Sequence, residues 1–174
     1  MPERREVLAF AGVGIIAGIA GWILSSRSTA PATDTQVLRS TRFADLAGKA
    51  RSLSEWDGRV RVVNFWATWC APCREEIPAL VQSREKLLAS GVEFIGIAID
   101  QAPKVAEFVR SVGISYPVLL AGAEALDLVR DLGNPSGGLP FTVVLDRKGS
   151  VAHRNLGVVT REKIEKQVQD TLAS

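Results

Sequence analysis

The order of apolar and polar residues divides the chain into one long apolar run and a series of short ones. The long run, residues 7–24 (VLAFAGVGIIAGIAGWIL), has no charged side chain and would extend about 27 Å as a helix, close to the hydrocarbon thickness of a bilayer. Because Arg4 and Arg5 precede it, the positive-inside rule places residues 1–6 in the cytoplasm and the rest of the chain outside. The pattern predicts an uncleaved single-pass anchor, with cleavage near Ser28-Thr29-Ala30, as in a signal peptide, as the alternative.

The residues after this run separate into a polar segment and a patterned domain. Residues 25–36 are rich in Ser, Thr, Ala and Pro and predict a flexible tether to a folded domain at residues 37–174. Short β-branched and aromatic runs are typical of strands, and they fall at 60–67, 92–99, 117–120, 141–145 and 151–156. Apolar residues at helical spacing predict helices at 74–90, 105–112, 124–132 and 160–172.

Turn residues complete this pattern. Residues 43–53 predict a short hairpin that turns at Gly48, and Asp146 to Gly149 predict the turn of a second hairpin. A β-α-β part is therefore followed by an antiparallel hairpin and a last helix. This order predicts one α/β domain, in which a mixed sheet is covered by helices on both faces.

Length and charge agree with one catalytic domain and an appendage. The chain has 174 residues, and its 21 Lys and Arg are interspersed with 19 Asp and Glu. Neither a basic stripe nor an acidic tail is present in the sequence, so no nucleic-acid partner is expected.

The candidate chemistry lies in the two cysteines of the chain, Cys70 and Cys73, at the junction of a predicted strand and a predicted helix. The amino terminus of a helix stabilises negative charge, which favours the thiolate needed for disulfide exchange. Cys70 is therefore the expected nucleophile, and Cys73, one turn on, is the expected resolving thiol. Pro72 suits the first helical turn, where its missing N–H costs no hydrogen bond.

Three other uses of a cysteine pair compete with redox chemistry. Structural zinc normally needs four ligands, and the chain adds only His153, to which we assign no role. An inert structural disulfide would close a loop too short to stabilise the fold much. A Cu(I)-binding, metallochaperone-like module using Cys70 and Cys73 is the main alternative, because soft thiolates suit Cu(I).

Two blocks of sequence resemble a known family. Residues 63–78 (VNFWATWCAPCREEIP) and 138–146 (GLPFTVVLD) are similar to the TlpA/ResA-like branch of the thioredoxin superfamily, which includes the cytochrome c maturation thioredoxins. The resemblance spans about residues 38–172 and implies a thioredoxin-like fold.

The resemblance also implies roles for particular residues. It implies a cis bond before Pro140 that stands against the cysteines, and a thiol-tuning role for Glu76, which helical spacing places on the face of Cys73. Substrates are expected to contact Trp69, Ala71, Pro72 and Leu139. Trp66 is expected to pack in the core, and Asn64, in a buried strand, requires a hydrogen-bond partner that the sequence does not identify.

The expected activity is that of an extracytoplasmic protein thiol-disulfide oxidoreductase that works without an organic cofactor or a metal. Reductants and oxidants share C-x-x-C spacing, with potentials that differ by on the order of 150 mV, and we expect the reducing direction. By resemblance, the substrates are cysteines of apocytochrome c or of respiratory oxidase assembly. A membrane thiol donor would supply the electrons, and a monomer is expected.

Overall fold

The computed structural model describes residues 33–174. The predicted cytoplasmic segment 1–6, the predicted anchor 7–24 and residues 25–32 of the predicted tether lie outside the described residues. Among residues 33–174, no helix combines the length and the apolar character needed to cross a membrane.

The folded domain begins earlier than the sequence pattern predicted. Residues 33–36, assigned to the tether, belong to helix α2 (Thr33–Ser40). This helix is anchored by Leu38, which is fully buried among the core residues of one sheet face. A single buried leucine in a short polar helix gives no apolar periodicity, which is why composition alone indicated a tether.

The described elements alternate between strands and helices. After α2 come β1 (Phe43–Asp45), β2 (Ala50–Arg51), the 3₁₀ helix η1 (Leu53–Trp56), β3 (Val60–Trp66), α3 (Ala71–Leu87), the 3₁₀ helix η2 (Leu88–Ser90), β4 (Val92–Ile99), α4 (Ala102–Val112), β5 (Val118–Ala121), α5 (Ala125–Asp131), β6 (Phe141–Leu145), β7 (Val151–Leu156) and α6 (Arg161–Leu172).

Within residues 33–174 the strands form one seven-stranded sheet in the order β2-β1-β5-β4-β3-β6-β7. β3, β4 and β5 run parallel, while β1, β2, β6 and β7 join by antiparallel pairing. Every residue of β3 and β4 is buried, as their continuous apolar runs predicted. The expected mixed sheet is confirmed.

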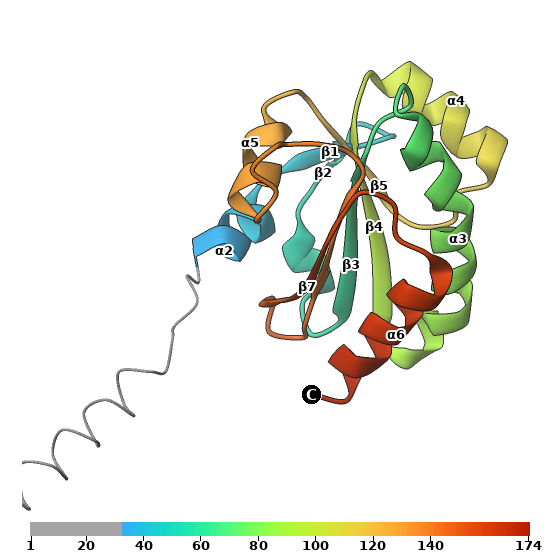
Figure 1. Ribbon diagram of the computed structural model, residues 1–174. Coiled ribbons are helices and arrows are strands. Elements are labelled where there is room, and N and C mark those ends of the chain that lie inside the picture. The colour runs from blue at the N-terminus through green and yellow to red at the C-terminus, as the bar shows by residue number, and fades with distance from the viewer. Residues whose placement is uncertain (1–32) are drawn as a thin grey trace, which may run out of the picture. The chain divides into compact units, whose positions relative to one another are not determined.

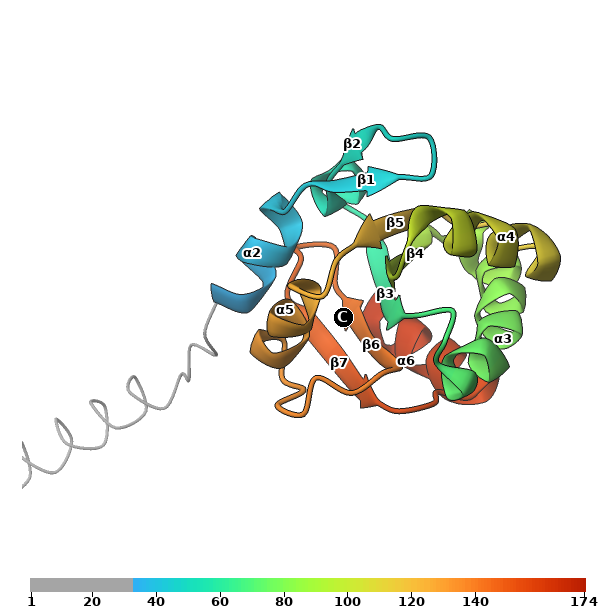
Figure 2. The same ribbon diagram turned by 90° about the horizontal axis from the view of Figure 1, so that it is seen from above.

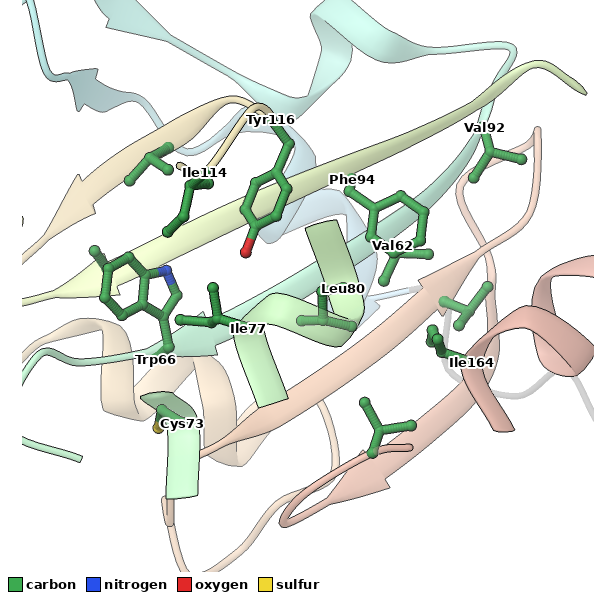
Figure 3. Close-up of a cluster of buried hydrophobic side chains, with 14 of the residues drawn as sticks. Val62, Trp66, Cys73, Ile77, Leu80, Val92, Phe94, Ile114, Tyr116 and Ile164 are labelled. Atoms are coloured by element: carbon green, nitrogen blue, oxygen red, sulfur yellow. The ribbon is translucent and has the colours of Figure 1, made fainter. Parts of the chain in front are cut away.

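Helices cover both faces of the sheet, as Figures 1 and 2 show, with α3, α4 and α6 on one face and α2 and α5 on the other. Alternate residues of a strand serve opposite faces. Val62 and Trp66 of β3 pack under α3, whereas Val63 and Phe65 pack toward α2 and α5. Figure 3 shows the first of these cores, with Trp66, Ile77 and Tyr116 gathered at the end nearest Cys73.

Local signals in the sequence fix several element ends. Gly91 and Gly113 end η2 and α4 in the left-handed conformation, with φ of 79° and 74°. The first hairpin closes through a hydrogen bond from the Gly48 N–H to the Asp45 carbonyl at 2.9 Å, and the second through Gly149 and Asp146 at 3.0 Å. Both predicted turns are confirmed.

Candidate active site at the cysteine pair

The two cysteines lie at the start of α3, beyond the end of β3. They form a disulfide with 5.3 Å between their Cα atoms. Cys70 is the amino-terminal cap of α3, and its sulfur accepts a hydrogen bond from the Cys73 N–H at 3.3 Å. The predicted strand-to-helix junction at the pair is confirmed. A thiolate at Cys70 in the reduced protein would therefore face the positive end of a long helix.

Access to the pair is limited and unequal. The exposed fraction is 6% for Cys70 and 0% for Cys73. Around Cys70 the chain is open, because Ala71 and Pro72 are exposed and Trp69 is 66% exposed. A bulky apolar side chain left in solvent beside a reactive sulfur is a ready contact surface for another polypeptide.

A groove continues from this exposed indole. A hollow of about 350 Å³ lies between Trp69, Ile99, Asp100 and Leu126. It shares Asp100, among other residues, with a larger hollow of about 600 Å³ bordered by α2, β1 and α5. The carboxyl ends of β4 and β5 are thus open to solvent next to the cysteine loop.

The loop that carries Trp69 and Cys70 is tied to the end of β4. The Thr68 hydroxyl donates a hydrogen bond to Oδ2 of Asp100, whose Oδ1 accepts from the Gln101 N–H at 2.7 Å. Partial burial opposes ionisation of Asp100, but these hydrogen bonds and the charge of Lys104 together outweigh it, so the pKa of Asp100 lies below the usual value. Sequence reasoning missed this link, since the two residues lie far apart in the chain.

Pro140 opens β6 at the same end of the sheet. The Leu139–Pro140 bond is cis, as the family resemblance implied. Since Phe65 of β3 pairs with Phe141 of β6, Pro140 lies next to the end of β3 from which the cysteine loop departs. Pro140 is buried, and Leu139 beside it is half-buried. The structure thus brings Leu139 and Pro140 to the edge of the sheet that bears Cys70.

Glu76 is buried below the cysteines, with only 2% of its surface exposed. Its Oε1 accepts a hydrogen bond from Asn64 Nδ2 at 2.8 Å, and its Oε2 accepts one from the Val159 N–H at 2.9 Å. Burial raises the pKa of Glu76 to about 7, against the opposing effect of these two hydrogen bonds. Its neighbour Glu75 is exposed. The Glu76 carboxyl is therefore a buried group that can gain or lose a proton near neutral pH.

The partner that Asn64 required is thus Glu76, and Asn64 also donates to the Thr142 hydroxyl at 2.9 Å. Asn64 and Thr142 are directly paired residues of β3 and β6 that face α3. Sequence reasoning singled out Asn64 but not Thr142, the second polar residue at a core-facing strand position.

Trp66 and His153 lie in different surroundings. Trp66 is fully buried and its ring lies 5.3 Å from that of Phe108, so it packs as predicted. His153, to which no role was assigned, is a half-buried residue of β7. Among residues 33–174, no group of three or more His, Cys, Asp and Glu side chains is placed to hold a metal ion.

Sequence comparison places these features in context. The pattern of the Redoxin family matches residues 27–172. The thiol-disulfide oxidoreductase ResA of Bacillus anthracis is 32% identical over 123 residues, which cover 70% of this chain and 68% of ResA. The thiol:disulfide interchange protein HelX of Rhodobacter capsulatus is 35% identical over 124 residues, covering 67% of this chain and 63% of HelX.

A solved structure has a similar fold. The crystal structure of a thiol:disulfide interchange protein of the thioredoxin family from Chlorobium tepidum superimposes with a TM-score of 0.68 at 32% identity. The match covers 76% of this chain and 92% of that one.

Proposed function

The chain belongs to the Redoxin family and is a thiol-disulfide oxidoreductase, and from that premise we propose that it reduces disulfides in proteins outside the cytoplasmic membrane. The observation that carries this proposal is the arrangement around the disulfide. A shielded cysteine pair at a helix amino terminus is bordered by the exposed Trp69 and by Pro140. Such a rim can hold an extended polypeptide while its disulfide meets Cys70.

The reaction proceeds through a mixed disulfide. In the reduced protein, the Cys70 thiolate attacks one sulfur of the substrate disulfide, a new S–S bond forms, and the other substrate sulfur leaves as a thiolate. Cys73 then loses its proton and attacks the Cys70 sulfur, which releases the second substrate sulfur. The electron pair passes to the substrate, and the protein is left with the Cys70–Cys73 disulfide.

Glu76 is the proposed acceptor of the Cys73 proton. It lies one turn beyond Cys73 on the buried side of α3, and no solvent base reaches a cysteine with no exposed surface. A pKa of about 7 lets the carboxyl take up and release a proton near neutral pH. The proposed sites of substrate contact are Trp69, Ala71, Pro72 and Leu139.

The place of action and the partners follow from the predicted anchor and the family resemblance. We place the domain on the outer side of the cytoplasmic membrane, held by residues 7–24. The proposed substrates are paired cysteines of the cytochrome c maturation or respiratory oxidase assembly type. Because that compartment is oxidising, a membrane thiol donor must return the pair to the dithiol.

The test is the reduction potential of the Cys70/Cys73 couple in the full-length protein in detergent, equilibrated against defined thiol-disulfide buffers. A reductant is expected near the thioredoxin value of about −270 mV. A value near about −120 mV, typical of a strong oxidant, would contradict the reducing direction and leave the exchange chemistry intact.

A further inference from the structure

Asn64 donates a hydrogen bond to Glu76, but the side-chain oxygen of Asn64 has no hydrogen-bond partner within residues 33–174. Both hydrogen bonds of the side chain are donated by Nδ2, to Glu76 Oε1 at 2.8 Å and to Thr142 Oγ1 at 2.9 Å. Within residues 33–174, the buried Oδ1 of Asn64 has no hydrogen-bond partner. Rotation of the amide by half a turn about its last torsion would point Oδ1 at Glu76 and Thr142 and place Nδ2 where Oδ1 now lies.

The present orientation suits only one state of Glu76. An ionised carboxylate accepts hydrogen bonds and donates none, so Nδ2 is its proper partner. A protonated carboxyl must also place its O–H. The Oε2 atom faces the Val159 N–H, which can only donate, so the proton belongs on Oε1, opposite Asn64. There it meets an N–H group unless the amide turns and presents Oδ1.

Thr142 fits both orientations of the amide. Its hydroxyl accepts from Nδ2 in the orientation seen here, and it can donate to Oδ1 in the reversed one. The direct pairing of Asn64 with Thr142 across β3 and β6 keeps this hydroxyl in reach in either case.

We propose that Asn64 is a positioning residue whose side-chain amide reverses when Glu76 gains or loses its proton, with the Thr142 hydroxyl as its partner in both orientations. This inference rests on the proposed proton-accepting role of Glu76. When Cys73 passes a proton to Glu76, the Asn64 amide would turn. The ionised carboxylate would then face the N–H group of Asn64, and the protonated carboxyl would face its carbonyl oxygen.

The other titratable groups that face Glu76 do not supply this partner. Cys73 lies on the same helix and is in the disulfide. Tyr116, in the segment before β5, is buried, and burial followed by the charge of Glu76 raises its pKa above its usual range. Tyr116 therefore stays protonated while Glu76 titrates, and within residues 33–174 its hydroxyl makes no hydrogen bond to Glu76 or to any other group.

The chain contains three asparagines, Asn64, Asn134 and Asn155, which makes a direct NMR test practical. The oxidised full-length protein, labelled with ¹⁵N in asparagine and ¹³C in glutamate, is followed between about pH 5 and pH 9. At high pH the Asn64 amide protons are expected to show contacts to the Thr142 methyl group. At low pH these contacts are expected to vanish, with a midpoint equal to that of the Glu76 carboxyl carbon.

A titrating Glu76 carbon beside Asn64 contacts that do not change would overturn the inference and leave the proton-acceptor role standing. A Glu76 carbon that does not titrate in this range would overturn both. The amides of Asn134 and Asn155, which are bound to Gly138 and Gln167, are internal controls and should not respond.

A pair of matched variants tests the energetic side. Asn64→Leu removes the donor to the carboxylate and should raise the Glu76 midpoint by about one pH unit, because the ionised form loses the stronger hydrogen bond. Asn155→Leu changes an equally buried asparagine of β7 and should leave that midpoint unchanged. Equal midpoints in the two variants would overturn the inference.

Discussion

The backbone N–H of Val159 donates a hydrogen bond to Oε2 of Glu76 over 2.9 Å, although the two residues are 83 positions apart. Val159 is buried in the segment that leads into α6, and Glu76 lies on the helix that begins at the cysteines. The carboxyl is therefore held from outside its own helix, by a group that can only donate. This contact fixes one oxygen of Glu76 as an acceptor and favours the ionised form.

Burial affects the pKa of Glu76 more strongly than the hydrogen bond from Val159 does. The raised pKa makes the stability of the protein depend on pH. The pKa of Glu76 rises from 4.5 to about 7 in the folded protein, so the native state binds this proton more tightly than the unfolded chain does. The free energy of unfolding should then fall as pH rises through this window, by about 3 kcal/mol, and level off above it.

Urea unfolding of the oxidised protein at pH 5 and pH 8 measures this change. Glu76→Gln should abolish the fall, whereas Glu75→Gln, on the exposed side of the same turn, should retain it. A fall of the same size in Glu76→Gln would show that another group is responsible.

The roles of the two cysteines can be separated by trapping. With a reduced Cys73→Ser variant, a disulfide-bonded substrate should remain attached through Cys70, because the second attack is missing. With Cys70→Ser no adduct should form, since the remaining cysteine has no exposed surface. Non-reducing electrophoresis and mass spectrometry identify the adduct. Adducts of equal yield in the two variants would contradict the assignment.

Trp69→Ala tests the proposed substrate rim. We expect kcat/KM for a protein disulfide to fall roughly tenfold, which corresponds to about 1.4 kcal/mol of lost transition-state binding. Because the indole is 66% exposed, the free energy of unfolding should change by less than about 0.5 kcal/mol. Val37→Ala, an exposed apolar residue of α2, is the control and should alter neither quantity. An unchanged kcat/KM in Trp69→Ala would remove Trp69 from the binding surface.

Gly96→Ala tests how tightly the core beneath the cysteines is packed. A Cβ atom at Gly96 would lie 2.9 Å from Nε1 of Trp66 and 3.1 Å from a ring carbon of Tyr116. Both rings are buried, so the substitution should destabilise the protein by about 1–3 kcal/mol in urea unfolding. Gly138→Ala, at an exposed position, should cost much less. Equal costs would mean that Trp66 and Tyr116 can move aside.

Much of the fold could be predicted because its signals are local. β3 and β4 are buried on both faces, so each appears in the sequence as a continuous apolar run. β4 has the predicted bounds, and β3 ends one residue before the predicted strand does. The start of the domain could not be read in this way, because α2 is held by the packing of Leu38 rather than by a pattern of its own.

In the candidate active site, too, the residues with local sequence signals could be predicted, and the contacts between distant residues could not. Cys70 and Cys73 carry a local motif, and helical spacing alone places Glu76 on the face of Cys73. The environment of Glu76 depends on strand register and on a backbone N–H, and any residue other than proline at position 159 would offer the same donor. The hydrogen bond from the Val159 N–H to Glu76 therefore cannot be predicted from a pattern of side chains in the sequence.

The full burial of Cys73 has a consequence for the chemistry of an oxidising compartment. A soluble oxidant or a stray thiol that reaches the domain from solvent meets only the edge of Cys70. Cys73 can react only with the sulfur of Cys70, once that sulfur has formed a disulfide with the substrate. The sequence of the two exchange steps is thus imposed by shape, and it would persist even if the acidities of the two thiols were made equal.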